Sequence, residues 1–430
     1  MSSRALALTR DSDNSPLWRA AALLLRPLYL GLAFPSILYV AAMTVFLFRP
    51  PDLFSYYADR IAFGVLVFFI VLRTMALREK VRFFAGLSLP MIGLAALAVF
   101  RALREPFDAQ NWSVIASKFI VPFVLFHIAV LVFRGESQRR HFEIFVTFAL
   151  AYLVFIAIAF FADARSLIFP RFILDESIGF HPDRARGPFL QAVANGMSLN
   201  ILGILVFVFA LSRKRKTAVW LLWLTLPLAV LATMTRAVWI AFAASSIVLG
   251  FRFIQRRLLA ACALLAVAAL LVGLVIGFSD HALKIALLDR TQERGPVEAR
   301  LAVYDAGWAM FRERPLTGWP AGGMYAELAR RMEGYHLRIY YVHNTYLALL
   351  VEFGVPGLAL YTILFFNLFC LAWRAPPGES GTVARLRKVW PILLGVYLFN
   401  AFFVDMAYQF VIGLMFTVAG MLCASEEPAT

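Results

Sequence analysis

The 430-residue chain is too apolar for a soluble fold: 62% of its residues are hydrophobic and 16% are charged, whereas about a quarter are charged in soluble domains. Its net charge of +15 would point to nucleic acid in a soluble protein, but here most cations separate apolar blocks. These blocks are roughly twenty residues long, enough to cross a hydrocarbon layer about 30 Å thick. We therefore expect an integral membrane protein with no nucleic-acid partner.

The polar N-terminal segment, residues 1–27, lacks the apolar stretch and cleavage site of a signal peptide, so the first helix should be an uncleaved anchor. Each apolar block should be a helix, because an unpaired backbone group in lipid costs several kcal/mol. The predicted fold is all-α, one polytopic integral-membrane domain over residues 1–430 with about twelve transmembrane helices. We place them near 28–48, 57–75, 84–102, 114–133, 142–162, 189–211, 217–234, 236–254, 258–278, 344–373, 389–405 and 407–424.

Orientation follows from the cations in alternate short loops, since such loops face the cytoplasm. One set of loops carries Arg73, Arg78, Lys80 and Arg82; Arg134, Arg139 and Arg140; Arg213, Lys214, Arg215 and Lys216; Arg252, Arg256 and Arg257; and Arg374, Arg385, Arg387 and Lys388. The other short connections carry only Arg49 and Arg104. Both termini are therefore predicted to be cytoplasmic.

Two outer segments are longer, 163–188 and 279–343, and loops of this length usually carry function. Within the second, residues 300–314 read as an amphipathic helix that Pro315 and Gly318 end. Its apolar stripe comprises Leu301, Tyr304, Trp308 and Phe311. We expect this helix to lie on the membrane surface or to cap a cavity.

Both outer segments are rich in arginine, whose planar donor fork suits phosphate. The arginines are Arg165, Arg171, Arg184 and Arg186 in the first segment, and Arg290, Arg294, Arg300, Arg312, Arg314, Arg330, Arg331 and Arg338 in the second. Arg186, Arg236 and His343 each precede or begin a helix that descends from the outer face, where the helix N-terminus favours anions. These three residues should therefore lie at one depth and form a phosphate site. A solvated or snorkelling cation is the alternative for each arginine.

His343 opens a stretch in which Asn344 or Thr345 can cap a helix, and Pro356 should bend that helix. A histidine at the boundary between water and membrane can accept a proton from a sugar hydroxyl. Glu352 is the main ionisable residue expected at mid-span, which disfavours an ion-coupled transporter. The cysteines Cys262, Cys370 and Cys423 lack the spacing of a zinc site, and the only Asp-x-Asp pair, Asp11 and Asp13, lies in the polar N-terminal segment. No metal or cofactor is therefore expected.

The stretch His343-Asn344-x-x-Leu347-x-x-Leu350-x-Glu352-x-Gly354-x-x-Gly357-Leu358 resembles the His-x10-Gly signature of the O-antigen ligase and polymerase superfamily. Arg186-Gly187-Pro188-Phe189-Leu190 resembles the family's Arg-x3-Leu element. The segment 300–318 is similar to the helix and turn that precede the signature. The first five predicted helices contribute only topology to this resemblance.

The resemblance implies a bacterial inner-membrane glycosyltransferase with a periplasmic active site. It would transfer a glycan from undecaprenyl pyrophosphate to a lipid A-core hydroxyl, without a metal or a nucleotide sugar. His343 would be the general base, and Arg186 and Arg236 would neutralise the pyrophosphate. Further substrate-binding candidates are Arg184, Arg300, Arg338, Asn344 and Gly354.

Three alternatives remain open at this point. An O-antigen polymerase or a protein O-oligosaccharyltransferase of the same superfamily would share these features. Histidine in the signature favours the ligase over the polymerase, in which that position is commonly arginine. A lipid-linked oligosaccharide flippase would explain the helices and outer arginines without catalysis, but it should show polar residues through the bundle centre.

Overall fold

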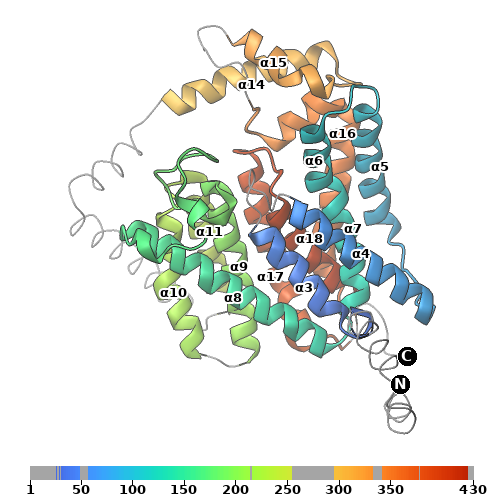
Figure 1. Ribbon diagram of the computed structural model, residues 1–430, viewed down its shortest axis with the longest axis vertical. Coiled ribbons are helices and arrows are strands. Elements are labelled where there is room, and N and C mark those ends of the chain that lie inside the picture. Colours follow the sequence, from blue (N-terminus) through green and yellow to red (C-terminus); the bar gives the residue numbers. More distant parts are fainter. Residues whose placement is uncertain are drawn as a thin grey trace, which may run out of the picture.

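The computed structural model describes residues 26, 29, 31–48, 57–213, 216–253, 295–332, 341–376 and 378–424. None of these residues forms a strand, and helices joined by short turns make up most of them (Figure 1). The main helices are α3 (Pro35–Leu47), α4 (Ala58–Leu77), α5 (Ala85–Ala102), α6 (Ala109–Ile115), α7 (Val121–Val132), α8 (Glu136–Phe161), α9 (Ala192–Ser212), α10 (Lys216–Leu231), α11 (Arg236–Phe253), α14 (Gly295–Glu313), α15 (Ala321–Arg331), α16 (Thr345–Cys370), α17 (Gly381–Ala401) and α18 (Gln409–Ala424). The predicted all-helical class is confirmed.

Seven helices within the described ranges are long and apolar enough to cross a membrane. They are Ala58–Leu77, Ala85–Ala102, Ala109–Val132, Glu136–Phe161, Ala192–Ser212, Arg236–Phe253 and Thr345–Trp373. Shorter apolar helices cover Pro35–Leu47, Leu221–Leu231 and Gln409–Ala424. The chain is thus a multi-pass membrane protein. The count of about twelve stays a prediction, and the helix expected at 258–278 lies outside the described residues.

The centre of the bundle is the pair α7 and α18, which pack along each other (Figure 1). A Cβ atom at Gly420 would lie 2.6 Å from the Phe126 carbonyl oxygen, so glycine permits this close approach. On one side α16 packs along α5, and on the other α17 packs against α9 and α11. Large apolar side chains remain exposed on the outer helices, among them Phe68 of α4 and Phe148 of α8. Such a surface suits lipid.

The sequence placed the start of α17 too late, near 389. The helix begins at Gly381 and includes the cationic segment. Arg387 is buried there because its guanidinium pairs with Glu379 at 2.8 Å and donates to the Leu371 carbonyl at 2.6 Å. A paired arginine can lie inside the protein, so the charged segment is helical rather than a loop.

The helix expected at 300–314 is present as α14, but its buried face differs from the predicted stripe. Val303, Ala306 and Met310 are buried, whereas Leu301 and Trp308 are 57% and 46% exposed. The buried face packs with residues of α15 and α16. Figure 1 shows α14 and α15 lying across the end of the bundle at which α16 begins.

Candidate active site at the start of α16

The helix α16 is broken at Gly354, whose backbone is non-helical (φ 66°, ψ −162°). The break leaves backbone groups without helical partners, and the turn after α14 supplies new ones. The Val355 N–H donates to the Pro315 carbonyl at 2.7 Å, and the Trp319 N–H donates to the Val351 carbonyl at 2.8 Å. The turn is thereby fixed to the membrane helix by backbone hydrogen bonds.

Glycine is required on both sides of this junction. A Cβ atom at Gly354 would lie 2.4 Å from the Pro315 carbonyl oxygen, and one at Gly318 would lie 2.2 Å from the Glu352 carbonyl oxygen. Both residues also have φ near +65°, which L side chains rarely adopt. Gly354, expected to contact substrate, therefore holds the backbone of the site in shape.

Asn344 is the N-cap of α16, because its Oδ1 accepts from the backbone N–H groups of Tyr346 and Leu347 at 3.0 Å each. This satisfies two amides of the first helical turn. His343, directly before the cap, has a left-handed backbone (φ 49°). The Tyr304 hydroxyl contacts the His343 carbonyl oxygen at 3.2 Å and so ties α14 to this turn.

His343 is exposed, and two opposite charges act on its imidazole. Loss of hydration within the surrounding protein lowers its pKa below the ordinary value, and the positive charge of Arg300 lowers the pKa further. The negative charge of Asp405 acts in the opposite direction. The net lowering keeps the imidazole neutral at neutral pH, the form that can accept a proton.

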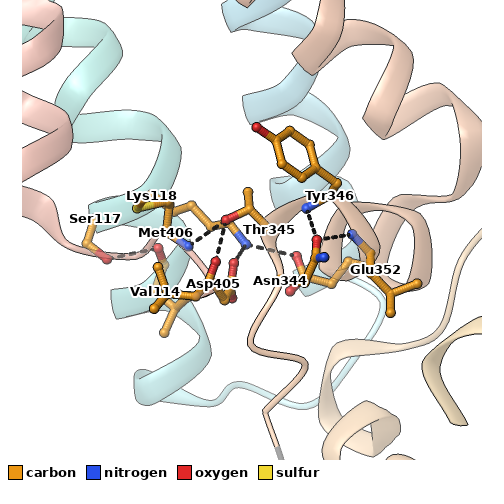
Figure 2. Close-up of polar contacts among 11 residues, drawn as sticks. Val114, Ser117, Lys118, Asn344, Thr345, Tyr346, Glu352, Asp405 and Met406 are labelled. Atoms are coloured by element: carbon orange, nitrogen blue, oxygen red, sulfur yellow. Dashed lines mark hydrogen bonds and ion pairs between the residues drawn. The ribbon is translucent and has the colours of Figure 1, made fainter. Parts of the chain in front are cut away.

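A buried ion network lies beside the start of α16 (Figure 2). The ammonium of Lys118 is 2.8 Å from Asp405 Oδ1 and 3.5 Å from Glu352 Oε2. Lys118 comes from a π-helical segment, Ala116–Ile120, between α6 and α7. Glu352 comes from α16, and Asp405 from the loop 402–408 between α17 and α18. Three distant parts of the chain thus meet beside the start of α16.

Thr345 joins the same loop to α16. Its buried hydroxyl donates to the Val404 carbonyl at 2.8 Å and accepts from the Met406 N–H at 3.0 Å (Figure 2). Asp405 is therefore held between two residues that are both bonded to the helix start.

Arg186 is turned into the loop 163–188 rather than toward solvent. Its guanidinium donates to the carbonyls of Ile173 at 3.1 Å and of Ile178 at 2.6 Å, and to that of Asp175. Only 1% of the residue is exposed. Burial lowers the pKa of this guanidinium, and nearby carboxylates oppose the lowering. The Arg186 side chain thus holds the loop together.

Arg184 and Arg236 belong to neighbouring segments. The Ala185 N–H donates to the Ala232 carbonyl at 3.0 Å, which places the segment 184–186 beside the turn between α10 and α11. Arg236 is the first residue of α11 and is half-buried. Arg184 is buried, lies 3.5 Å from Asp183, and has an Nε atom with no hydrogen-bond partner.

The segment with these arginines also packs against the start of α18, directly after the loop 402–408, because the rings of Phe189 and Phe410 lie 5.5 Å apart. The structure therefore gathers the segments 184–191, 232–236, 343–345 and 402–410 by direct contacts or through one shared neighbour. Arg300 joins them through its effect on His343. Arg338 lies outside the described residues.

In the comparison with protein-family models, residues 220–362, about a third of the chain, match the O-antigen ligase family. This match supports the O-antigen ligase and polymerase superfamily. Its members are membrane glycosyltransferase-like enzymes that use lipid-linked glycans and lipid acceptors. The comparison with curated proteins found no match.

The matched segment includes Arg236, Arg300, His343 and Gly354, but it does not include two residues of the ion network beside the start of α16. Lys118 and Asp405 lie outside it, and the sequence reasoning missed both. A signal for Lys118 existed, since a lysine inside an apolar block is unfavourable in lipid unless it is paired. Its partner could not be read from the sequence, because 287 positions separate Lys118 from Asp405.

Proposed function

We propose that this protein is an O-antigen ligase, which transfers a glycan from undecaprenyl pyrophosphate to a hydroxyl of the lipid A-core oligosaccharide. The observation that carries the proposal is the environment of His343. This histidine lies at the start of the kinked α16, inside the family match, with Arg300 and Asp405 in electrostatic reach. A histidine with a lowered pKa beside a cation is suited to accept a proton next to an anionic donor.

In the proposed reaction the neutral His343 takes the proton of the acceptor hydroxyl. The hydroxyl oxygen attacks the anomeric carbon of the first donor sugar and forms the new glycosidic bond. The bond from that carbon to the pyrophosphate oxygen breaks, and undecaprenyl pyrophosphate leaves. A single displacement of this kind inverts the anomeric configuration, and the activated donor makes ATP unnecessary.

The proposed pyrophosphate site consists of Arg236 with Arg184 and Arg300. Guanidinium groups and the N-terminus of α11 neutralise charge that grows on the leaving oxygen. Arg186 has the indirect role of holding the adjacent loop, because its donors are bonded to backbone carbonyls. Asn344 and Gly354 shape the backbone around His343. Arg338 remains a proposed contact of the substrate.

We place this chemistry on the periplasmic face of the bacterial inner membrane, in a single membrane domain with both termini cytoplasmic. The loop cations of the sequence support that orientation. The loop 279–343, which includes α14, would then cover the active site. Surrounding membrane lipids are the remaining partners, and the proposed reaction involves no metal or cofactor.

The test is reconstitution of the purified protein in vesicles with an undecaprenyl-pyrophosphate glycan and lipid A-core, followed by mass analysis. A ligase yields one glycan joined to lipid A-core. A polymerase yields longer lipid-linked glycans, a protein-glycosylating enzyme requires an added peptide, and a flippase moves the donor without forming a bond. Any of these three results in place of the ligase product would reject the proposal.

His343→Ala should abolish transfer while protein level and donor binding persist. His141→Ala is the matched control, since His141 contacts Ser36 elsewhere in the bundle. Retained transfer by His343→Ala would remove the proposed base.

A further inference from the structure

Lys118 is a buried cation that is not among the residues of the proposed donor site. Its side chain is 5% exposed, and the partner carboxylates of Glu352 and Asp405 are 13% and 16% exposed. An unpaired charge at such a depth costs several kcal/mol. The lysine is therefore tied to these carboxylates, and they are in turn kept from repelling each other.

The local backbone turns Lys118 toward this pair. It lies in the π-helical segment Ala116–Ile120, which interrupts the span from Ala109 to Val132. A π-turn adds one residue to a helical turn, and such turns are frequent at functional sites. The cation–π contact between Lys118 and Phe119, at 5.7 Å, lies on the same segment.

The loop 402–408 connects this ion pair to the proposed base. Val404 and Met406, on either side of Asp405, are bonded to Thr345, two positions after His343. The Tyr304 hydroxyl is 3.2 Å from both the Phe402 and the His343 carbonyl oxygens. The loop therefore contacts Thr345 at two points and shares the Tyr304 hydroxyl with His343, while Lys118 binds Asp405 in the same loop (Figure 2).

We propose that Lys118 is a positioning residue for glycan transfer: its ammonium binds Asp405 and Glu352 and thereby fixes the loop 402–408 that places His343. The inference rests on the proposed function. Lys118 contacts neither the donor nor the acceptor, so its removal should impair the chemical step rather than substrate binding.

The first experiment measures kcat and both substrate KM values for Lys118→Met in the reconstituted transfer assay. A displacement of the base by about 1 Å lowers kcat by about 100-fold, and we expect a loss of that order with both KM values unchanged. Lys388→Met, at an exposed lysine of α17, is the control and should behave as the native protein. A raised KM with native kcat would instead mean that Lys118 binds substrate, and it would overturn the proposal.

A second set of variants tests the network itself. Glu352→Gln keeps the pair of Lys118 with Asp405 and should retain most of kcat. Adding Glu352→Gln to Lys118→Met removes the repulsion between two unpaired carboxylates, so the double variant should recover part of the lost kcat. Lys118→Arg keeps the charge and should exceed Lys118→Met in kcat. If neither the double variant nor Lys118→Arg exceeds Lys118→Met in kcat, the positioning role is overturned.

If Lys118→Met does not accumulate as folded protein, kcat of the double variant and of Lys118→Arg is compared with that of the native protein. A folded double variant with native kcat would contradict the inference. Transfer by the native protein distinguishes a failure of the proposed function from a failure of the Lys118 role, because absence of transfer by the native protein rejects the proposed function. Normal transfer by both the native protein and Lys118→Met rejects only the role of Lys118.

Discussion

The charges around His343 make its pKa a measurable test of the proposed base. The neutral form accepts the proton, so transfer should fall as the pH drops through the pKa of His343. Because that pKa lies below the ordinary value, activity should persist into mildly acidic solution. Arg300→Ala removes a positive charge that lowers the pKa, so the acidic limit of activity should move to higher pH.

The measurement for Arg300→Ala is the pH dependence of kcat, which is independent of any overall loss in donor binding. Arg300→Lys is the control, because it keeps the charge and should leave the acidic limit close to that of the native protein. An acidic limit that stays in place in Arg300→Ala would show that His343 does not titrate in this step.

Arg186 and Arg236 should respond differently to substitution by lysine. Arg186 donates to several backbone carbonyls in different directions, and a lysine does not reproduce that planar fork. We therefore expect both Arg186→Ala and Arg186→Lys to lower the melting temperature. Loss of one partner of a buried hydrogen-bonded charge costs several kcal/mol.

Arg236→Lys should instead keep a measurable part of transfer, since a cation remains at the start of α11. Arg236→Ala should lose transfer. Melting curves and transfer assays on the four variants test the assignment, which fails if Arg186→Lys is as stable as the native protein.

Sequence patterns identify individual candidate residues of the site but not the residues that these contact. His343 and Gly354 follow from one local motif, and Asn344 follows from the rules of helix capping. Arg186 was expected at a phosphate because it precedes a helix whose N-terminus favours anions. Its actual partners are carbonyls of a loop without regular periodicity, and no sequence pattern encodes such contacts.

At the scale of elements, the junction between the turn after α14 and the kink of α16 determines the shape of the site. Gly354→Ala should destabilise the protein by about 1–3 kcal/mol from backbone strain alone, with a further loss from the contact to Pro315. Gly318→Ala should behave similarly, because its Cβ would meet the Glu352 carbonyl. Thermal unfolding in detergent measures both.

Gly323→Ala is the matched control for these two variants. Gly323 lies in α15, and a Cβ atom there would meet nothing within 4 Å. Alanine in a regular helix is more favourable than glycine, so this variant should be at least as stable as the native protein. Equal stability of Gly354→Ala and Gly323→Ala would contradict the described junction.

Apolar blocks in the sequence predicted where the helices lie, but they did not predict which face of each helix is buried. In α14 the most apolar stripe was expected to pack, yet the smaller residues Val303 and Ala306 are buried. The turn at Pro315 fixes the rotation of α14 through backbone bonds to α16. Tertiary contact therefore overrides the amphipathic pattern, which predicts a buried stripe only when the helix is free to rotate.

For the whole molecule, hydropathy identifies segments that can enter lipid. It does not show how deeply each helix is buried in the bundle or which side of the membrane each loop occupies. α4 and α9 are both apolar, yet α4 exposes most of its surface and α9 is almost fully buried. Orientation depends on loop cations. Helices α14 and α15 lie across the end of the bundle at which α16 begins (Figure 1). The ion network lies beside the start of the same helix, so a single labelling experiment can locate the proposed site.

Single cysteines introduced after replacement of the native cysteines by serine should test that location. Thr317→Cys lies in the exposed turn after α14 and should react with a membrane-impermeant maleimide in intact spheroplasts. Ser137→Cys, exposed near the start of α8, should react only after the membrane is opened. Each variant is first shown to transfer glycan, so that the label reports the native arrangement. Labelling of Ser137→Cys but not Thr317→Cys in intact spheroplasts would place the His343 site in the cytoplasm, where the proposed acceptor chemistry does not occur.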